Sequence, residues 1–269
     1  MAAADLDLDM DALALKGTRR GGAAIGVGAP APVNQARRAR WVLLVSAAVT
    51  LALYIIPYGH AIARPLLYLS TLVHELGHGL AAMIVGGQFV RLEMWGDGSG
   101  VALTAAATNW QHALITAGGL VGPAVAAAFG FAVARRAGWA RWALGAIGLL
   151  LVWAMVFKVR NGFGLLVAGA VAAGALLVAW RARADWAQLV LGFLSVQLAL
   201  SVFSRADYLF MEKAQTGAGV GDSDSAAIGH LLGGPYWLWG GLCAAFSIVA
   251  LAAGAWLMLR GVARRQSVV

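Results

Sequence analysis

The amino-acid sequence predicts an all-α membrane protein with about seven spans and one short β-hairpin. Of its 269 residues, 61% are hydrophobic and 12% are charged, whereas about a quarter of a soluble domain is charged. Several uninterrupted apolar stretches reach the roughly 20 residues that a helix needs to cross a hydrocarbon core. Arginines are concentrated in the short connections between these stretches, where they anchor helix ends to lipid headgroups. These observations predict a helical protein embedded in a lipid bilayer.

Seven apolar segments have the length and composition of membrane spans. They cover residues 41–59, 65–85, 110–134, 140–157, 162–180, 186–203 and 236–259. Residues 1–40 differ from them, because this stretch is rich in alanine, glycine and arginine and contains Pro30 and Pro32. We expect residues 1–40 to be a disordered tail and residues 41–269 to form one membrane-embedded domain.

The segment after the second predicted span has the alternating pattern of a β-strand. Val90, Leu92 and Met94 are apolar, and they are separated by charged residues. A glycine-rich turn at 96–100 leads into a second run, so we predict a β-hairpin over residues 88–104. Because an edge strand offers unpaired backbone groups, Val90 and Leu92 are candidate contacts for an extended peptide substrate.

The chain has a formal net charge of +8, which in a soluble protein would suggest binding to nucleic acid. Here most arginines flank apolar segments, so anchoring to the bilayer explains the charge and no nucleic-acid partner is expected. Six basic residues precede the first predicted span, which favours a cytoplasmic N-terminus. We therefore expect a multi-pass protein of the plasma membrane of a bacterium.

The second predicted span contains the sequence His74-Glu75-Leu76-Gly77-His78. Positions i and i+4 of an α-helix share one face, so both imidazoles can bind the same ion. Zinc suits two neutral imidazoles, and the adjacent Glu75 is the candidate general base. Chance gives on the order of 0.001 such motifs in a chain of this composition. A buried charge in lipid costs at least ~2.5 kcal/mol, which also favours a functional role.

Two histidines and a water leave zinc one protein ligand short. The missing ligand must be histidine or a carboxylate, because Cys243 is the only cysteine and lies in an apolar segment. The strongest candidates are Asp222 and Asp224, a close acidic pair that precedes the helix-like run 226–232. Either acid taken alone has a plainer explanation as a helix cap, so the residues by themselves leave the choice open.

These features resemble the site-2 protease superfamily, whose members are intramembrane zinc metallopeptidases with an HExxH helix and a distant aspartate ligand. Four features carry the resemblance: the motif at 74–78, the hairpin after it, the step Gly122-Pro123, and the late acidic segment. Together they cover roughly residues 65–130 and 220–245.

The acidic segment is the point at which this chain departs from most of the superfamily. Most members carry the second metal motif as Leu-Asp-Gly, whereas this chain has Asp222-Ser223-Asp224-Ser225. That form is similar to a compact branch without a PDZ domain, and it implies Asp224 as the third ligand, with Asp222 as the alternative.

The resemblance implies hydrolysis of peptide bonds in a membrane-embedded or membrane-proximal substrate, with zinc as cofactor and Glu75 as general base. The alternative is a zinc-binding membrane protein without proteolytic activity, either a transporter or a scaffold. A transporter would more often show internal repeats with interrupted spans, and the region around His74 has no second copy in the sequence.

Overall fold

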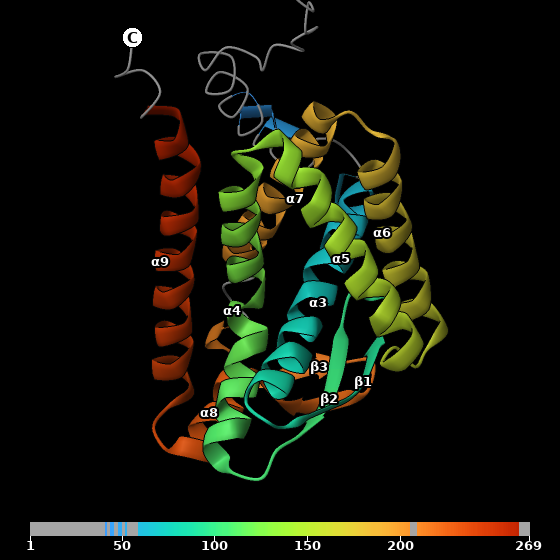
Figure 1. The fold of residues 1–269 in the computed structure, drawn as a ribbon. Coiled ribbons are helices and arrows are strands. Elements are labelled where there is room, and N and C mark those ends of the chain that lie inside the picture. Colours follow the sequence, from blue (N-terminus) through green and yellow to red (C-terminus); the bar gives the residue numbers. More distant parts are fainter. Residues whose placement is uncertain are drawn as a thin grey trace, which may run out of the picture. The chain divides into compact units, whose positions relative to one another are not determined.

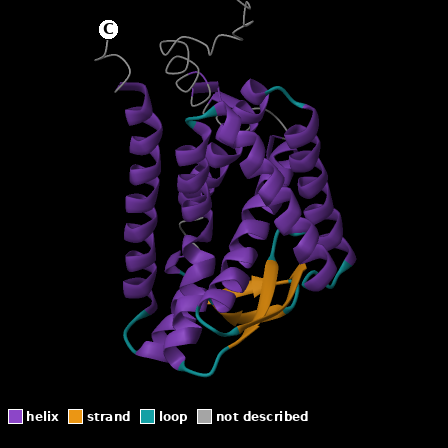
Figure 2. Ribbon diagram, in the orientation of Figure 1, coloured by secondary structure: helices purple, strands orange, loops and turns teal. Residues whose placement is uncertain are grey.

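The structure is a computed structural model that describes residues 59–204 and 209–263, together with isolated positions between 41 and 52. The described chain is mainly helical and has two small β-sheets (Figures 1 and 2). Five of its helices are long and apolar enough to cross a membrane. They are α4 (Asn109–Ala134), α5 (Ala137–Phe157), α6 (Gly162–Arg181), α7 (Ala184–Ser204) and α9 (Tyr236–Ala263).

These five helices occupy the places of the last five predicted spans. Large apolar side chains such as Trp142 and Leu166 are exposed on their surfaces, as expected for helices that face lipid. The predicted span 65–85 coincides, except for its last residue, with part of the 26-residue helix α3 (Gly59–Ile84). The predicted span 41–59 and the predicted tail 1–40 lie outside the described residues, apart from the isolated positions. The total of seven spans therefore stays a prediction.

Helix α3, which carries the histidine motif, packs closely against α4. A Cβ added at Gly118 of α4 would lie 2.9 Å from the carbonyl oxygen of Gly77 in α3, so glycine is needed at this crossing. Small residues at helix crossings are typical of packing in lipid. Leu72 and Leu76 of α3 belong to a separate buried cluster together with Leu92. The helix is thereby held on both sides.

Two antiparallel strands follow α3. Strand β1 (Gln88–Met94) pairs with β2 (Gly100–Ala105), and a bulge interrupts the register between Phe89 and Arg91. The turn between the strands is closed by a hydrogen bond from the Trp95 N–H to the Ser99 carbonyl. A β-hairpin thus comes directly after the helix that carries the histidines.

The outer edge of β1 is covered by the connection between α5 and α6. The N–H of Leu92 donates to the carbonyl of Lys158 at 2.9 Å, and the N–H of Arg160 donates to the carbonyl of Leu92 at 3.0 Å. Asn161 extends this pairing, because its side chain bonds both the N–H and the carbonyl of Met94. Strand β1 therefore has a partner on each side at its C-terminal half.

A second hairpin, which the sequence pattern did not predict, precedes the short helix α8 (Asp224–Leu232). Its strands are β3 (Lys213–Thr216) and β4 (Gly219–Asp222). The two hairpins touch at their tips, where the N–H of Gly217 donates to Ser99 Oγ at 2.9 Å. The two hairpins therefore meet although most of the membrane helices separate them in the sequence.

Candidate metal centre

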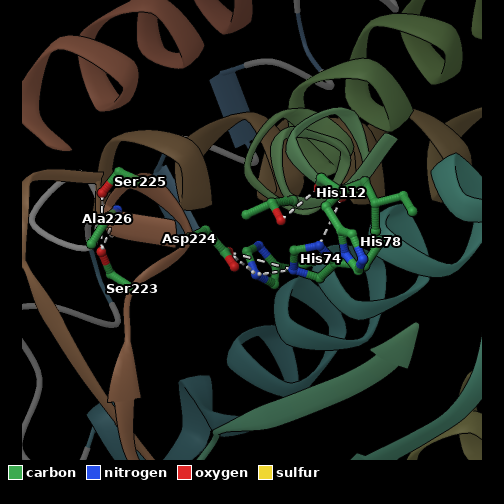
Figure 3. Close-up of polar contacts among 9 residues, drawn as sticks. His74, His78, His112, Ser223, Asp224, Ser225 and Ala226 are labelled. Carbon is green, nitrogen blue, oxygen red and sulfur yellow. Dashed lines mark hydrogen bonds and ion pairs between the residues drawn. The ribbon is translucent and has the colours of Figure 1, made fainter. Parts of the chain in front are cut away.

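His74 and His78 lie one helical turn apart on the same face of α3. Their Nε2 atoms are 3.2 Å apart, and Figure 3 shows the pair beside Asp224. The Nδ1 atom of His78 lies 2.9 Å from the backbone carbonyl oxygen of Ile115 in α4. Because a carbonyl oxygen only accepts, Nδ1 carries the proton of the neutral ring and Nε2 keeps its lone pair for a metal.

Asp224 approaches the two histidines from the first turn of α8. Its Oδ2 atom lies 3.0 Å from Nε2 of His74 and 3.4 Å from Nε2 of His78 (Figure 3). The preceding residue, Ser223, is fully buried and caps the helix. Its Oγ accepts a backbone N–H of the first helical turn and donates to the carbonyl of Met211. The cap fixes the start of α8 and with it the position of Asp224.

The three donor atoms fit a zinc ion. Their separations of 3.0, 3.2 and 3.4 Å match the ~3.3 Å that separates ligands in a tetrahedron with bonds of about 2.0–2.1 Å. Within the described part of the chain, the buried Oδ2 atom of Asp224 accepts no hydrogen bond, a state that a bound cation would relieve. Two imidazoles and one carboxylate leave the fourth position of the ion open.

Glu75, the predicted general base, is 5% exposed and lies against the first hairpin. The backbone of Ala102 in β2 hydrogen-bonds its carboxylate. A Cβ added at Gly100 would lie 2.9 Å from Glu75 Oε1, so the strand can come this close only because residue 100 has no side chain. The hairpin thus holds the carboxylate in place next to the histidines.

A pocket of about 80 Å³ opens beside His74 and Glu75. Its walls come from α3, α4 and α7 and from the tips of both hairpins. One water needs only about 10–15 Å³ of such space, so the pocket has room for water next to the Glu75 carboxylate.

Asp222, the alternative third ligand, lies outside the donor group formed by His74, His78 and Asp224. Its carboxylate bonds Lys213 Nζ and lies 3.0 Å from Nδ1 of His230. The hydrogen bond from Lys213 lowers the pKa of Asp222. Asp222 therefore joins β3, β4 and α8 on the exposed side of the second hairpin.

The predicted substrate contacts on β1, Val90 and Leu92, lie in different surroundings. Leu92 is 0% exposed, and both its backbone groups are bonded to the connection between α5 and α6. The expectation of unpaired backbone groups at Leu92 is therefore wrong, because the connection between α5 and α6 pairs with that edge of β1. Val90 lies at the bulge and is 42% exposed, and its contact with substrate stays a prediction.

Two features of α4 that support the metal centre were missed in the sequence. One is the carbonyl of Ile115, which orients His78, and backbone groups leave no trace in a motif. The other is Gly119, where an added Cβ would overlap the imidazole of His78. The pair Gly118-Gly119 lies in the predicted span 110–134, but its role depends on which helix lies opposite, and the sequence does not give that.

The comparison with protein families agrees with this arrangement. The model of a family described as Peptidase M50B-like matches residues 44–254, which is more than half of the chain. The chain belongs to this family. The membership confirms the resemblance to the site-2 protease superfamily and, together with the five apolar helices, supports a membrane-embedded metallopeptidase. Searches of curated proteins and of solved structures found no match.

Proposed function

We propose that this protein is an intramembrane zinc metalloprotease that hydrolyses peptide bonds of a membrane-embedded or membrane-proximal substrate. The observation that carries the proposal is the meeting of three donor atoms from His74, His78 and Asp224 beside a buried carboxylate, Glu75. Such a constellation supplies a metal with one open position and a base next to it. A purely structural metal site is usually closed by four protein ligands.

Each residue has a defined task in this proposal. His74, His78 and Asp224 hold the zinc ion, and Ile115 and Ser223 fix the orientation of two of these ligands. A bound zinc ion supplies Lewis acidity, which makes water a nucleophile near neutral pH. Glu75 accepts a proton from the attacking water and later delivers it to the leaving amine.

The environment of the pocket supports hydrolysis in the membrane. Apolar helices and the tips of both hairpins surround the pocket, and its volume of about 80 Å³ leaves room for water beside the metal centre. A helical substrate hides its amide groups in its own hydrogen bonds, so it must be extended before attack. We infer that the substrate enters the pocket as an extended segment alongside the joined tips of the two hairpins.

Cleavage of a labelled unstructured protein tests this proposal. We expect the purified protein in detergent to cleave fluorescently labelled casein, and a Glu75→Gln variant to bind zinc normally but to lose activity. A zinc chelator should abolish the activity of the wild type, and added zinc should restore it. Zinc binding without cleavage under any of these conditions would instead favour a scaffold or a transporter.

A further inference from the structure

The polar side chains that line the pocket, apart from His74 and Glu75, differ in whether their hydrogen bonds are already used. They come from α3, α7 and both hairpins and are Ser70, Thr71, Ser99, Ser201, Gln215 and Thr216. A side chain that hydrogen-bonds to other groups of the protein helps to build the wall. A side chain without such a bond is available to a ligand.

The side chains of four of these six residues already form hydrogen bonds within the protein. Thr71 donates to the carbonyl of Gly98, and Ser201 donates to the carbonyl of Leu198. The remaining two belong to the hairpin tips. There, Ser99 binds Asp97 and the N–H of Gly217, and Thr216 binds Gly219 and the N–H of Ala218. These four side chains keep the pocket in shape, and their hydroxyl protons are already donated, so they have none left for a peptide carbonyl.

The two others, Ser70 and Gln215, have no hydrogen-bond partner within the described chain, but their surroundings differ. Gln215 is exposed at the edge of the second hairpin, so its amide is accessible to water. Ser70 is 4% exposed and lies in the middle of α3. A serine in a helix commonly bonds the carbonyl four residues earlier, and the buried Ser195 does so with Leu191. Ser70 makes no such bond in the described chain. Because Ser70 lines the pocket, its hydroxyl can bond a ligand that occupies the pocket.

Ser70 is also well placed relative to the metal ligands. It precedes His74 by four residues, so the two side chains lie on one face of α3 with Cβ atoms about 5–6 Å apart. An extended peptide advances about 3.3 Å per residue. A peptide held at the metal centre would therefore bring a backbone group past Ser70 roughly one or two residues away from the bond that is cleaved.

We propose that Ser70 is a substrate-binding residue, whose hydroxyl donates a hydrogen bond to a backbone carbonyl of the extended substrate next to the scissile bond. The inference rests on the proposed proteolytic function. Because the carbonyl in question is not the one attacked, the bond has the same strength before and during the reaction. Its loss should therefore raise KM and leave kcat almost unchanged.

A Ser70→Ala variant tests this by kinetics, since alanine removes the hydroxyl and little volume. For cleavage of labelled casein we expect KM to rise roughly 3- to 10-fold, as for the loss of one neutral hydrogen bond, with kcat within about twofold of the wild type. Ser195→Ala is the matched control, because Ser195 is equally buried but lies outside the pocket wall. An unchanged KM, a fall in kcat alone, or an equal effect of Ser195→Ala would overturn the proposal.

Binding measured without turnover separates this inference from the proposed function. Labelled casein should bind the zinc-loaded Glu75→Gln protein, and adding Ser70→Ala should weaken the binding by roughly the same 3- to 10-fold factor. Equal affinity with and without the Ser70 hydroxyl would reject the role of Ser70 alone. Absence of cleavage by the wild type, with this difference in binding still present, would reject only the proteolytic function. Absence of any binding would reject both.

Discussion

Asp224 Oδ2 lies 3.0 Å from His74 Nε2, although α4, α5, α6 and α7 separate the two residues in the sequence. This contact joins the helix that carries the HExxH motif to the short helix after the second hairpin. It has a physical cost, because the buried Oδ2 atom of Asp224 accepts no hydrogen bond among the described residues. A bound cation would remove that cost.

Replacing each of the two aspartates in turn should show which one binds zinc and which one only supports the second hairpin. Asp224→Ala removes a donor atom, so we expect zinc affinity to fall by at least the ~10- to 100-fold typical of losing an outer-shell partner. Asp222→Ala breaks only the exposed contacts with Lys213 and His230 and should change the affinity much less. Competition with a zinc-binding dye measures both. Equal losses in the two variants would indicate shared ligation, and a larger loss for Asp222→Ala would reverse the assignment.

Glu75→Gln should separate catalysis from metal binding. Glutamine keeps the size of the side chain but accepts no proton from water, and loss of a general base commonly lowers the rate by roughly 10²- to 10⁴-fold. Zinc content should stay at the wild-type level, because Glu75 is outside the donor group. Undiminished cleavage by this variant would exclude the assigned mechanism, and loss of zinc would make Glu75 a structural residue.

The motif and the site differ in how well the sequence predicts them. His74 and His78 follow from helical periodicity alone, because residues four apart share a face. Asp224 required the resemblance to a known superfamily, since no local pattern says which of two neighbouring acids turns inward. The structure supplies the reason for the difference, namely that the Ser223 cap fixes the start of α8 while Asp222 pairs with Lys213 across the second hairpin.

The hairpins show where the sequence is least informative. The alternation of Val90, Leu92 and Met94 indicates a strand, but it does not say which loop covers the edge of that strand. The connection near Lys158 does so, and this pairing between distant segments has no sequence signal. The second hairpin was missed for a related reason: β3 and β4 have only four residues each and lack a clear apolar face.

Gly119→Ala tests whether the close contact between α4 and His78 is needed. The added methyl group would overlap the His78 imidazole, so either the ring or the helix must move. We expect weaker zinc binding and a loss of stability of roughly 1–3 kcal/mol, as for overpacking of a core. Gly174→Ala in α6 is the control, since within the described chain the added Cβ there would have no atom within 4 Å apart from the residues next to it and the backbone of its own helix. The same response in both variants would show a general effect of the substitution.

Photocrosslinking tests where the substrate lies. A photoreactive side chain at Gln215, at the pocket wall, should capture labelled casein, whereas one at the buried Leu92 should not. The same group at the exposed Val90 tests the remaining part of the predicted contact with β1. Efficient capture at Val90 with none at Gln215 would mean that the peptide docks on the first hairpin alone and does not reach the pocket wall formed by the second hairpin.

The central claim, that His74, His78 and Asp224 hold a zinc ion, is tested most directly by the metal content of the purified protein. Wild-type protein prepared without chelators is compared with a His74→Ala variant by elemental analysis. We predict about one zinc ion per wild-type chain, as three ligands and an open position imply, and almost none in the variant. A wild-type protein without zinc, or a variant that keeps the same zinc content, would contradict the claim.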